Sequence, residues 1–146
     1  MGKVRNILEA KGDGSGKIFS VEPTTIVYAA IEEMAQKNIG GLLITENGKL
    51  VGIFTERDYA RKLILKGKSS KDTPIGDLMT KSPFTVGLDS SIEECMQLMS
   101  NRRIRHLPVI ENEELVGVIS IGDVVRFIID EQKSIIAHLE SYIAGQ

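Results

Sequence analysis

Apolar positions follow a pattern that occurs twice along the chain. When the sequence is shifted by 65 residues against itself, residues 19–58 align with residues 84–123 without a gap. Identical pairs include Phe19 and Phe84, Val21 and Val86, Met34 and Met99, Ile39 and Ile104, Glu46 and Glu111, Asn47 and Asn112, Leu50 and Leu115, Val51 and Val116, Gly52 and Gly117, and Asp58 and Asp123. Matches of this kind indicate duplicated structure.

Each repeat predicts the same order of elements, strand, helix, strand, strand, helix. A short apolar strand, Phe19–Val21 or Phe84–Val86, precedes a helix whose apolar residues have i, i+3, i+4, i+7 spacing. Two strands follow and meet at a turn, Asn47-Gly48 in the first repeat and Asn112-Glu113 in the second. A last helix begins near Thr55 or Ser120. The predicted fold class is therefore α/β of the α+β type, with a β-α-β-β-α unit given twice.

A short segment before each repeat also recurs, as Val4–Leu8 and Ile75–Met79, but at a shift of 71 residues. The first repeat thus carries six extra residues, which lie within Lys11 to Lys17. The predicted organisation is an N-terminal helix and Gly-rich loop (1–17), a first repeat (18–66), a linker (67–74), a second repeat (75–130) and a C-terminal helical extension (131–146).

The second repeat continues into a long apolar stripe at helical spacing. It comprises Val125, Ile128, Ile129, Ile135, Ile136, Leu139, Tyr142 and Ile143. We expect one amphipathic helix from Ile121 onwards. Its apolar face has two possible partners, its own module including Val4–Leu8, or a second copy of the chain.

Composition narrows the classes of function. Of 146 residues, 42% are hydrophobic and 26% charged, and the net charge is −2 with scattered basic residues, which does not favour nucleic acid or an anionic membrane as a partner. No apolar run is long enough for a membrane span, and the amino terminus lacks a signal-peptide pattern, so a cytoplasmic location is expected. The single Cys95 cannot form an internal disulfide and is predicted to lie in the core.

Two motifs contain residues suited to phosphate or ribose binding. The Gly-rich segment of residues 11–17, KGDGSGK, fails as a P-loop, because that motif needs Gly at Lys11 and Ser or Thr at Ile18. The stronger candidates are GIFTERD (52–58) and GVISIGD (117–123). Their spacing fits a helix-capping box. Their position at the carboxyl end of a strand and the start of a helix equally suits a nucleotide.

These residues resemble a known family. The repeat order and the endings GIFTERD and GVISIGD, together with RIRHLPVI and the preceding IGDLM, are similar to cystathionine β-synthase-type (CBS) domains, which occur in pairs called Bateman modules. The resemblance covers nearly the whole chain and is closest to small bacterial stand-alone pairs. It implies two repeats packed with pseudo-twofold symmetry, and two clefts that hold adenosine-containing ligands such as AMP, ATP, NAD or S-adenosylmethionine.

The resemblance also implies roles for individual residues. Asp58 and Asp123 would bind ribose hydroxyls, with Thr55 and Ser120 close to ribose or phosphate. The segments Ile39-Gly40-Gly41 and Ile104-Arg105-His106 would line the adenine, each cleft drawing on both repeats. Arg57, Arg105 and His106 are the phosphate candidates, although His106 suits a structural hydrogen bond equally well. Arg102 and Arg103 are interpreted as a solvated helix end.

The halves differ at two of these positions, since Arg57 aligns with Gly122 and Gly40-Gly41 with Arg105-His106. We therefore expect one cleft to bind well and the other weakly or not at all, which calorimetry showing two equal sites would contradict. CBS pairs commonly form flat dimers, so the resemblance favours a homodimer.

Three functions are weighed: a ligand-sensing regulatory module acting on an unknown partner, a ligand-free dimeric interaction scaffold, and an enzyme. No nucleophile or metal-ligand motif surrounds His106, His138 or Cys95. The expectation is a non-enzymatic module without a metal.

Overall fold

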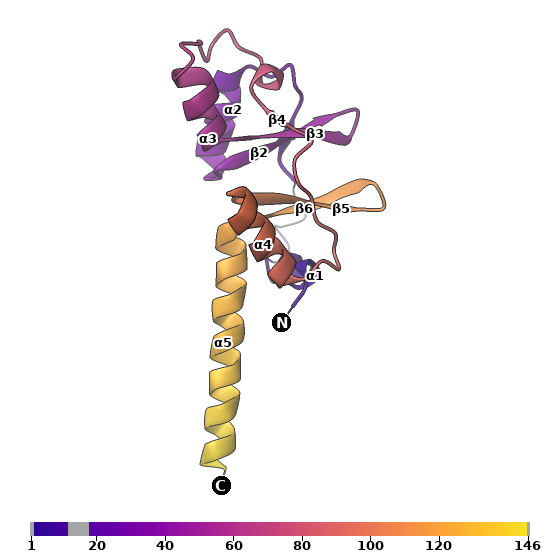
Figure 1. The fold of residues 1–146 in the computed structure, drawn as a ribbon, viewed down its shortest axis with the longest axis vertical. Coiled ribbons are helices and arrows are strands. Elements are labelled where there is room, and N and C mark those ends of the chain that lie inside the picture. The colour runs from indigo at the N-terminus through magenta and orange to yellow at the C-terminus, as the bar shows by residue number, and fades with distance from the viewer. Residues whose placement is uncertain (1, 12–17, 146) are drawn as a thin grey trace.

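A computed structural model, which describes residues 2–11 and 18–145, has the predicted order of elements in the first repeat and, from the first helix onwards, in the second (Figure 1). The predicted opening strand of the second repeat, Phe84–Val86, is wrong, because among the described residues only Val86 of this segment forms a β-bridge, to Val109. The first repeat contains β1 (Ser20–Val21), α2 (Val27–Lys37), β2 (Gly41–Glu46), β3 (Lys49–Thr55) and α3 (Glu56–Asp58), which continues as a π-helical segment, Tyr59–Ile64. The second contains α4 (Ile92–Arg102), β5 (His106–Glu111), β6 (Glu114–Ser120) and α5 (Ile121–Ala144), and it is preceded by a 3₁₀ turn (Ile75–Asp77) and β4 (Thr80–Lys81). A short helix, α1 (Val4–Ala10), precedes both. The predicted α+β fold is confirmed, and residues 12–17 of the Gly-rich segment lie outside the described residues.

Each repeat is built around an antiparallel hairpin. In the first, the strand order is β1-β2-β3-β4, with β1 parallel to β2 and the other pairs antiparallel. In the second, β5 pairs with β6, and a parallel bridge joins Val86 to Val109. The two turns have positive φ at both residues, 54° and 78° at Asn47 and Gly48, 51° and 66° at Asn112 and Glu113. The antiparallel pairing of β2 with β3 and of β5 with β6 confirms both predicted hairpins. Turns with positive φ at both central residues match the twist of the paired strands. The two sheets face each other, and helices cover their outer sides (Figure 1).

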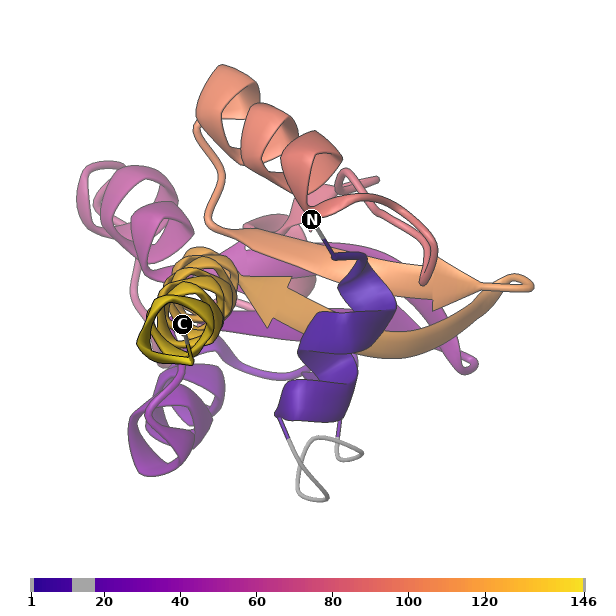
Figure 2. The ribbon, with the colours of Figure 1, turned by 90° about the horizontal axis from the view of Figure 1, so that it is seen from below.

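The segments preceding the repeats are exchanged between the two cores. Ile75 and Leu78, which precede the second repeat in sequence, are buried in the core of the first. Val4 and Ile7, which precede the first repeat, are buried in the core of the second. Figure 2 shows α1 against the β5–β6 hairpin. Fully burying such a side chain contributes about 1.5–3 kcal/mol to the free energy of folding. The exchange therefore stabilises the association of the two repeats.

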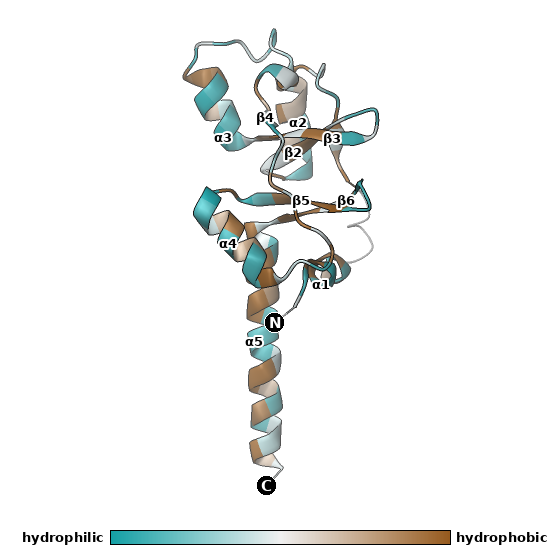
Figure 3. Cartoon of the chain, turned by 45° about the vertical axis from the view of Figure 1, so that its right-hand side comes forward, coloured by the Kyte–Doolittle hydropathy of each residue, from teal (hydrophilic) through white to brown (hydrophobic). Residues whose placement is uncertain are grey.

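The helix α5 leaves the module after its first turns. Val124 is fully buried, whereas Ile135, Ile136, Leu139, Tyr142 and Ile143 are 51–68% exposed. The free part of the helix therefore carries an apolar stripe, visible as brown segments in Figure 3. The predicted long helix is confirmed. Near its beginning, Phe127 lies beside Gly2, and Phe127 and Ile128 pack against the core that contains Val4 and Ile7 of α1. Among the described residues, no helix is long and apolar enough to cross a membrane.

Candidate ligand-binding clefts

Two clefts lie between the repeats. The Asp123 cleft, about 480 Å³, is lined by Lys11, Ile18, Phe19, Asn38, Ile39, Gly40, Gly41, Leu43, Ile53, His106, Gly117, Val118, Ser120 and Asp123. The Asp58 cleft, about 800 Å³, is lined by Gly40, Ile53, Thr55, Glu56, Arg57, Asp58, Thr80, Lys81, Ser82, Pro83, Phe84, Arg103, Ile104, Arg105, His106, Ser120, Ile121 and Gly122. The structure thus brings each Ser/Thr-x-x-Asp motif together with segments of the other repeat.

Asp58 closes a capping box at the start of α3. Its Oδ2 accepts hydrogen bonds from the Thr55 backbone N–H (3.0 Å) and hydroxyl (3.2 Å), and its own N–H donates to Thr55 Oγ1 at 3.3 Å. Its Oδ1 lies 3.1 Å from both Lys62 Nζ and Thr80 Oγ1. The capping role is therefore realised. Because a carboxylate offers about four acceptor positions, a ribose hydroxyl at Asp58 would have to displace one of these donors.

Asp123 repeats the capping box at the start of α5, with different neighbours. Its Oδ2 accepts from the Ser120 N–H (2.9 Å) and from Lys11 Nζ (3.1 Å), while Arg126 lies 3.5 Å from Oδ1. Burial alone raises the pKa of this carboxyl, but hydrogen bonds from Ser120 and the bond and charge of Lys11 outweigh it and hold the pKa below its ordinary value. Asp123 is therefore ionised at neutral pH.

His106 lines both clefts, as do Gly40, Ile53 and Ser120. A Cβ on Gly41 would lie 3.2 Å from the imidazole, and a Cβ on Gly40 would lie 2.9 Å from Glu56 Oε1. Gly41 thus lets the ring approach the backbone closely, and Gly40 leaves room for the Glu56 carboxylate. Burial lowers the pKa of His106, Arg105 lowers it further, and Asp123 and Glu56 oppose the shift. The imidazole is neutral at pH 7 and has one donor and one acceptor nitrogen.

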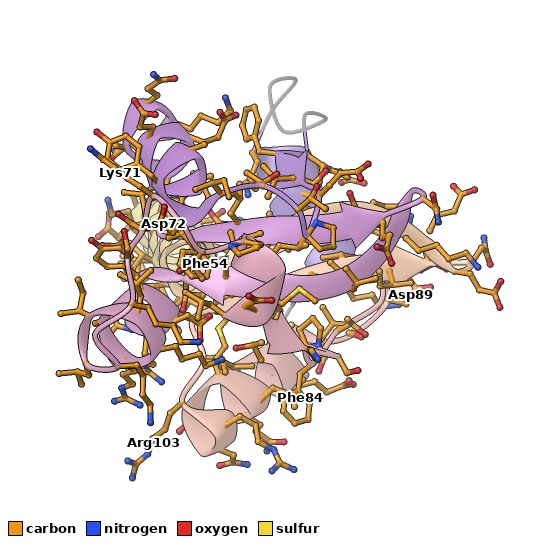
Figure 4. All side chains as sticks on the ribbon, turned by 90° about the horizontal axis from the view of Figure 1, so that it is seen from above. Phe54, Lys71, Asp72, Phe84, Asp89 and Arg103 are labelled. Carbon is orange, nitrogen blue, oxygen red and sulfur yellow. The ribbon has the colours of Figure 1, made fainter. Side chains whose placement is uncertain are left out.

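Basic side chains gather at the Asp58 cleft. Arg57 Nη1 donates to the Arg103 carbonyl at 2.6 Å, which links α3 to the end of α4. Arg105 and Lys81 line the same cleft. Arg103 is exposed at the helix end, as expected, yet it also lines this cleft, where Figure 4 shows it on the same side as Phe84.

An exposed aromatic ring lies at each cleft. Phe19 and Phe84 align in the repeat and are 38% and 45% exposed. Lys37 lies 4.4 Å over the first ring and Arg102 lies 4.8 Å over the second. Sequence reasoning assigned both rings to the opening strands and missed them as cleft residues. The recurrence of Phe at the same position of both repeats was the signal that could have indicated a binding role, because an aromatic residue at a strand edge is not always buried in the core.

Lys11, Thr80, Lys81 and Arg103 were also missed. Thr80 and Lys81 belong to β4, which pairs with the first repeat, and the sequence alone does not reveal that pairing. Cys95 is buried, as predicted, and its pKa is raised to about 11 by burial and the charge of Glu94. Within the described ranges, no group of three His, Cys, Asp or Glu side chains could hold a metal ion.

The pattern of paired repeats and clefts recurs in known proteins. The family model described as CBS domain matches residues 15–65 and 75–130. The chain belongs to the CBS domain family. The mitochondrial CBS domain-containing protein CBSX3 of Arabidopsis thaliana is 41% identical over 150 residues, covering 97% of this chain and 72% of the relative.

Solved CBS structures share the fold. A protein with CBS domains from Burkholderia ambifaria MC40-6 is 45% identical, covers 90% of this chain and 96% of its own, and superposes with a TM-score of 0.87. The CBS domain pair of protein MJ0100, solved with 5′-methylthioadenosine and S-adenosylmethionine, is 26% identical, covers 90% and 98% of the two chains, and has a TM-score of 0.77. The chain is therefore a tandem CBS pair.

Proposed function

We propose that this CBS pair is a regulatory module that binds an adenosine-containing ligand, such as AMP, ATP or NAD, between its repeats. One observation carries the proposal: each cleft combines a Ser/Thr-x-x-Asp motif from one repeat with the segment before the first hairpin strand of the other. The adenosine compounds bound by the MJ0100 pair support the choice of ligand class.

In the Asp58 cleft, the ligand would bind through three kinds of group. Asp58 accepts hydrogen bonds from the ribose hydroxyls. Breaking its contact with Thr80 or Lys62 offsets part of the free energy gained by binding. Phe84 offers an aromatic face for the adenine. Arg57 and Arg105 present guanidinium forks to phosphate oxygens.

The Asp123 cleft would hold its ligand with the equivalent groups. Asp123 and Ser120 would lie beside the ribose, and the adenine would lie along Ile39, Gly40 and Gly41. Ile104 and His106 would serve the Asp58 cleft in the same way.

A ligand held between the repeats can change their relative position. Because both repeats contribute to each cleft, the arrangement that closes on the ligand is favoured by its differential affinity. A partner protein that binds one arrangement better would detect the ligand through this coupling. The cytoplasmic location remains a prediction, and one relative of the chain is named as mitochondrial.

Thermal unfolding with AMP, ATP, NAD and S-adenosylmethionine tests the proposal. A ligand at 100 times its dissociation constant stabilises the folded state by about 2.7 kcal/mol, which raises the melting temperature. Asp58→Asn should reduce the shift of a ligand bound in that cleft, whereas Asp130→Asn, at an exposed position of α5, should leave it unchanged.

Other outcomes favour the other functions. No shift with any of the four compounds would favour the ligand-free scaffold. Nucleotide hydrolysis by the wild-type chain that disappears in Asp58→Ala and Asp123→Ala would indicate an enzyme.

The apolar stripe of α5 supports a homodimer as the working assembly. Val125, Ile129, Ile136, Leu139 and Ile143 are 46–68% exposed. Their spacing of four, seven, three and four residues fits a coiled-coil seam in which Gln132 occupies the position between Ile129 and Ile136. An isolated helical segment of this length is marginal in water, so a second copy of α5 would stabilise it. Sedimentation should give about twice the 16.0 kDa mass of one chain.

A further inference from the structure

The two clefts differ in the charge that they present. The described lining of the Asp58 cleft has four basic side chains, Arg57, Lys81, Arg103 and Arg105, against the carboxylates of Glu56 and Asp58. In addition, Lys62 neutralises Asp58 at 3.1 Å from outside the lining. The described lining of the Asp123 cleft has one base, Lys11, and one acid, Asp123. The described lining of the first cleft is therefore net positive, and that of the second is balanced.

Lys11 does not provide a free positive charge in its cleft. Its Nζ lies 3.1 Å from Asp123 Oδ2 and donates to the Val118 carbonyl at 3.0 Å. A phosphate that reached this ammonium group would lie beside an ionised carboxylate, and like charges at such a distance repel. The rest of the described lining is mainly apolar, with Ile18, Phe19 and Leu43 among its side chains.

The Asp123 cleft still has what a nucleoside needs. Among the described residues, Arg126 is the one that contacts Asp123 Oδ1, at 3.5 Å, and that side chain is 71% exposed, so this oxygen can accept from a ribose hydroxyl. Phe19 offers an aromatic face and His106 offers a neutral ring. The cations near its described lining already lie beside carboxylates, Arg126 beside Asp123, and Lys37, which lies over Phe19, beside Glu33 at 2.7 Å. Placing a phosphate dianion there is therefore costly. An uncharged nucleoside meets no such cost.

We infer that the clefts select ligands by charge, a phosphorylated adenine nucleotide in the Asp58 cleft and a phosphate-free adenine nucleoside in the Asp123 cleft. The inference rests on the proposed function and extends it, because the module would then respond to two classes of metabolite at once. His106, which lines both clefts, would be in contact with both occupants.

Isothermal titration with AMP and with 5′-methylthioadenosine, separately and together, tests the inference. Each compound should bind to one site, and saturation with one should leave a site for the other. The repeat supplies a matched pair of variants, Phe19→Leu and Phe84→Leu, which remove equivalent rings outside the capping boxes. Phe19→Leu should weaken 5′-methylthioadenosine about tenfold and spare AMP, and Phe84→Leu should do the reverse.

Charge supplies the second measurement. Arg57→Gln combined with Arg105→Gln should weaken AMP at least tenfold and leave 5′-methylthioadenosine unchanged, and added salt should weaken AMP alone.

The results that would contradict charge selection differ from those that would contradict the proposed function. Competition of the two compounds for one site, or AMP binding equally in both clefts, would overturn the charge selection while leaving the adenosine module intact. Binding of neither compound would overturn both.

Discussion

At the scale of single residues, His106 connects the packing of the module to pH. Burial keeps its pKa below the ordinary value, and Glu56, Asp123 and Arg105 are the charged groups that act on it. The unfolded chain therefore binds this proton at a higher pH than the folded chain does. The stability associated with the neutral ring is present above the unfolded pKa of about 6.5 and falls as the pH drops below it.

We accordingly predict that the free energy of unfolding decreases between pH 7.5 and pH 5.5, by at most ~1.4 kcal/mol per pH unit for this one group. His106→Gln should remove that slope, while His138→Gln, at an exposed position, should not. Urea titrations over this range measure it. The carboxyl of Asp123, whose pKa is also lowered, contributes in a separate window, because its stabilisation is lost only as the pH falls below about 4. An unchanged slope in His106→Gln would show that other groups control the response.

At the scale of elements, the exchanged segments give the motif glycines their function. A Cβ on Gly52 would lie 2.5 Å from Met79 Sδ and 3.0 Å from the Thr80 carbonyl, and a Cβ on Gly117 would lie 3.0 Å from Leu8 Cδ2. Leu8 and Met79 are themselves equivalent in the preceding segments. The glycine of each β3 or β6 strand thus leaves room for the segment received from the other half.

Gly52→Ala should therefore destabilise the chain by about 1–3 kcal/mol, the usual cost of overpacking a close contact. The matched control is Gly122→Ala, whose Cβ would lie 3.6 Å from Ser120 Oγ in ordinary contact, and it should change stability little. Chemical denaturation compares the two variants. Equal stability of Gly52→Ala and wild type would mean that Met79 moves aside without cost.

The elements also show how far the sequence could predict this molecule. Helices, hairpin turns and capping boxes depend on neighbouring residues, so the positions of Asn47-Gly48 and Thr55-x-x-Asp58 were predictable from spacing. The period of an apolar stripe shows which face of an element is buried, but it does not show which other element packs against that face. The exchange of Val4–Leu8 and the pairing of β4 with β3 were therefore not predictable, and neither was the contact of Lys11 with Asp123, which lie 112 residues apart.

The same limit applies to the clefts. The family resemblance supplied both aspartates and the segments around Gly40 and His106, and the structure brings these together between the repeats. Their binding roles stay predictions. The orientation of Phe19 and Phe84 toward the clefts depends on the packing of the whole repeat, which the local pattern does not contain.

At the scale of the whole molecule, α5 defines how two copies would meet. Lys133 and Glu140 are both exposed and, seven residues apart, flank the same side of the apolar seam. In an antiparallel pair, flanking positions on the same side face each other. If Ile136 of each copy packs against Leu139 of the other, Lys133 of each copy lies opposite Glu140 of the other. A parallel pair offers no such match at these positions.

We therefore predict an antiparallel dimer whose charges can be exchanged. Lys133→Glu should weaken dimerisation about tenfold, because two attractive pairs worth ~0.2–1 kcal/mol each become repulsive. Lys133→Glu combined with Glu140→Lys should restore the wild-type dissociation constant. Analytical ultracentrifugation over a concentration series measures both. A double variant as weak as the single one would exclude the antiparallel register, since only facing charges can compensate each other. The bodies of the two copies would then need another contact to bring the exposed stripes of α5 together.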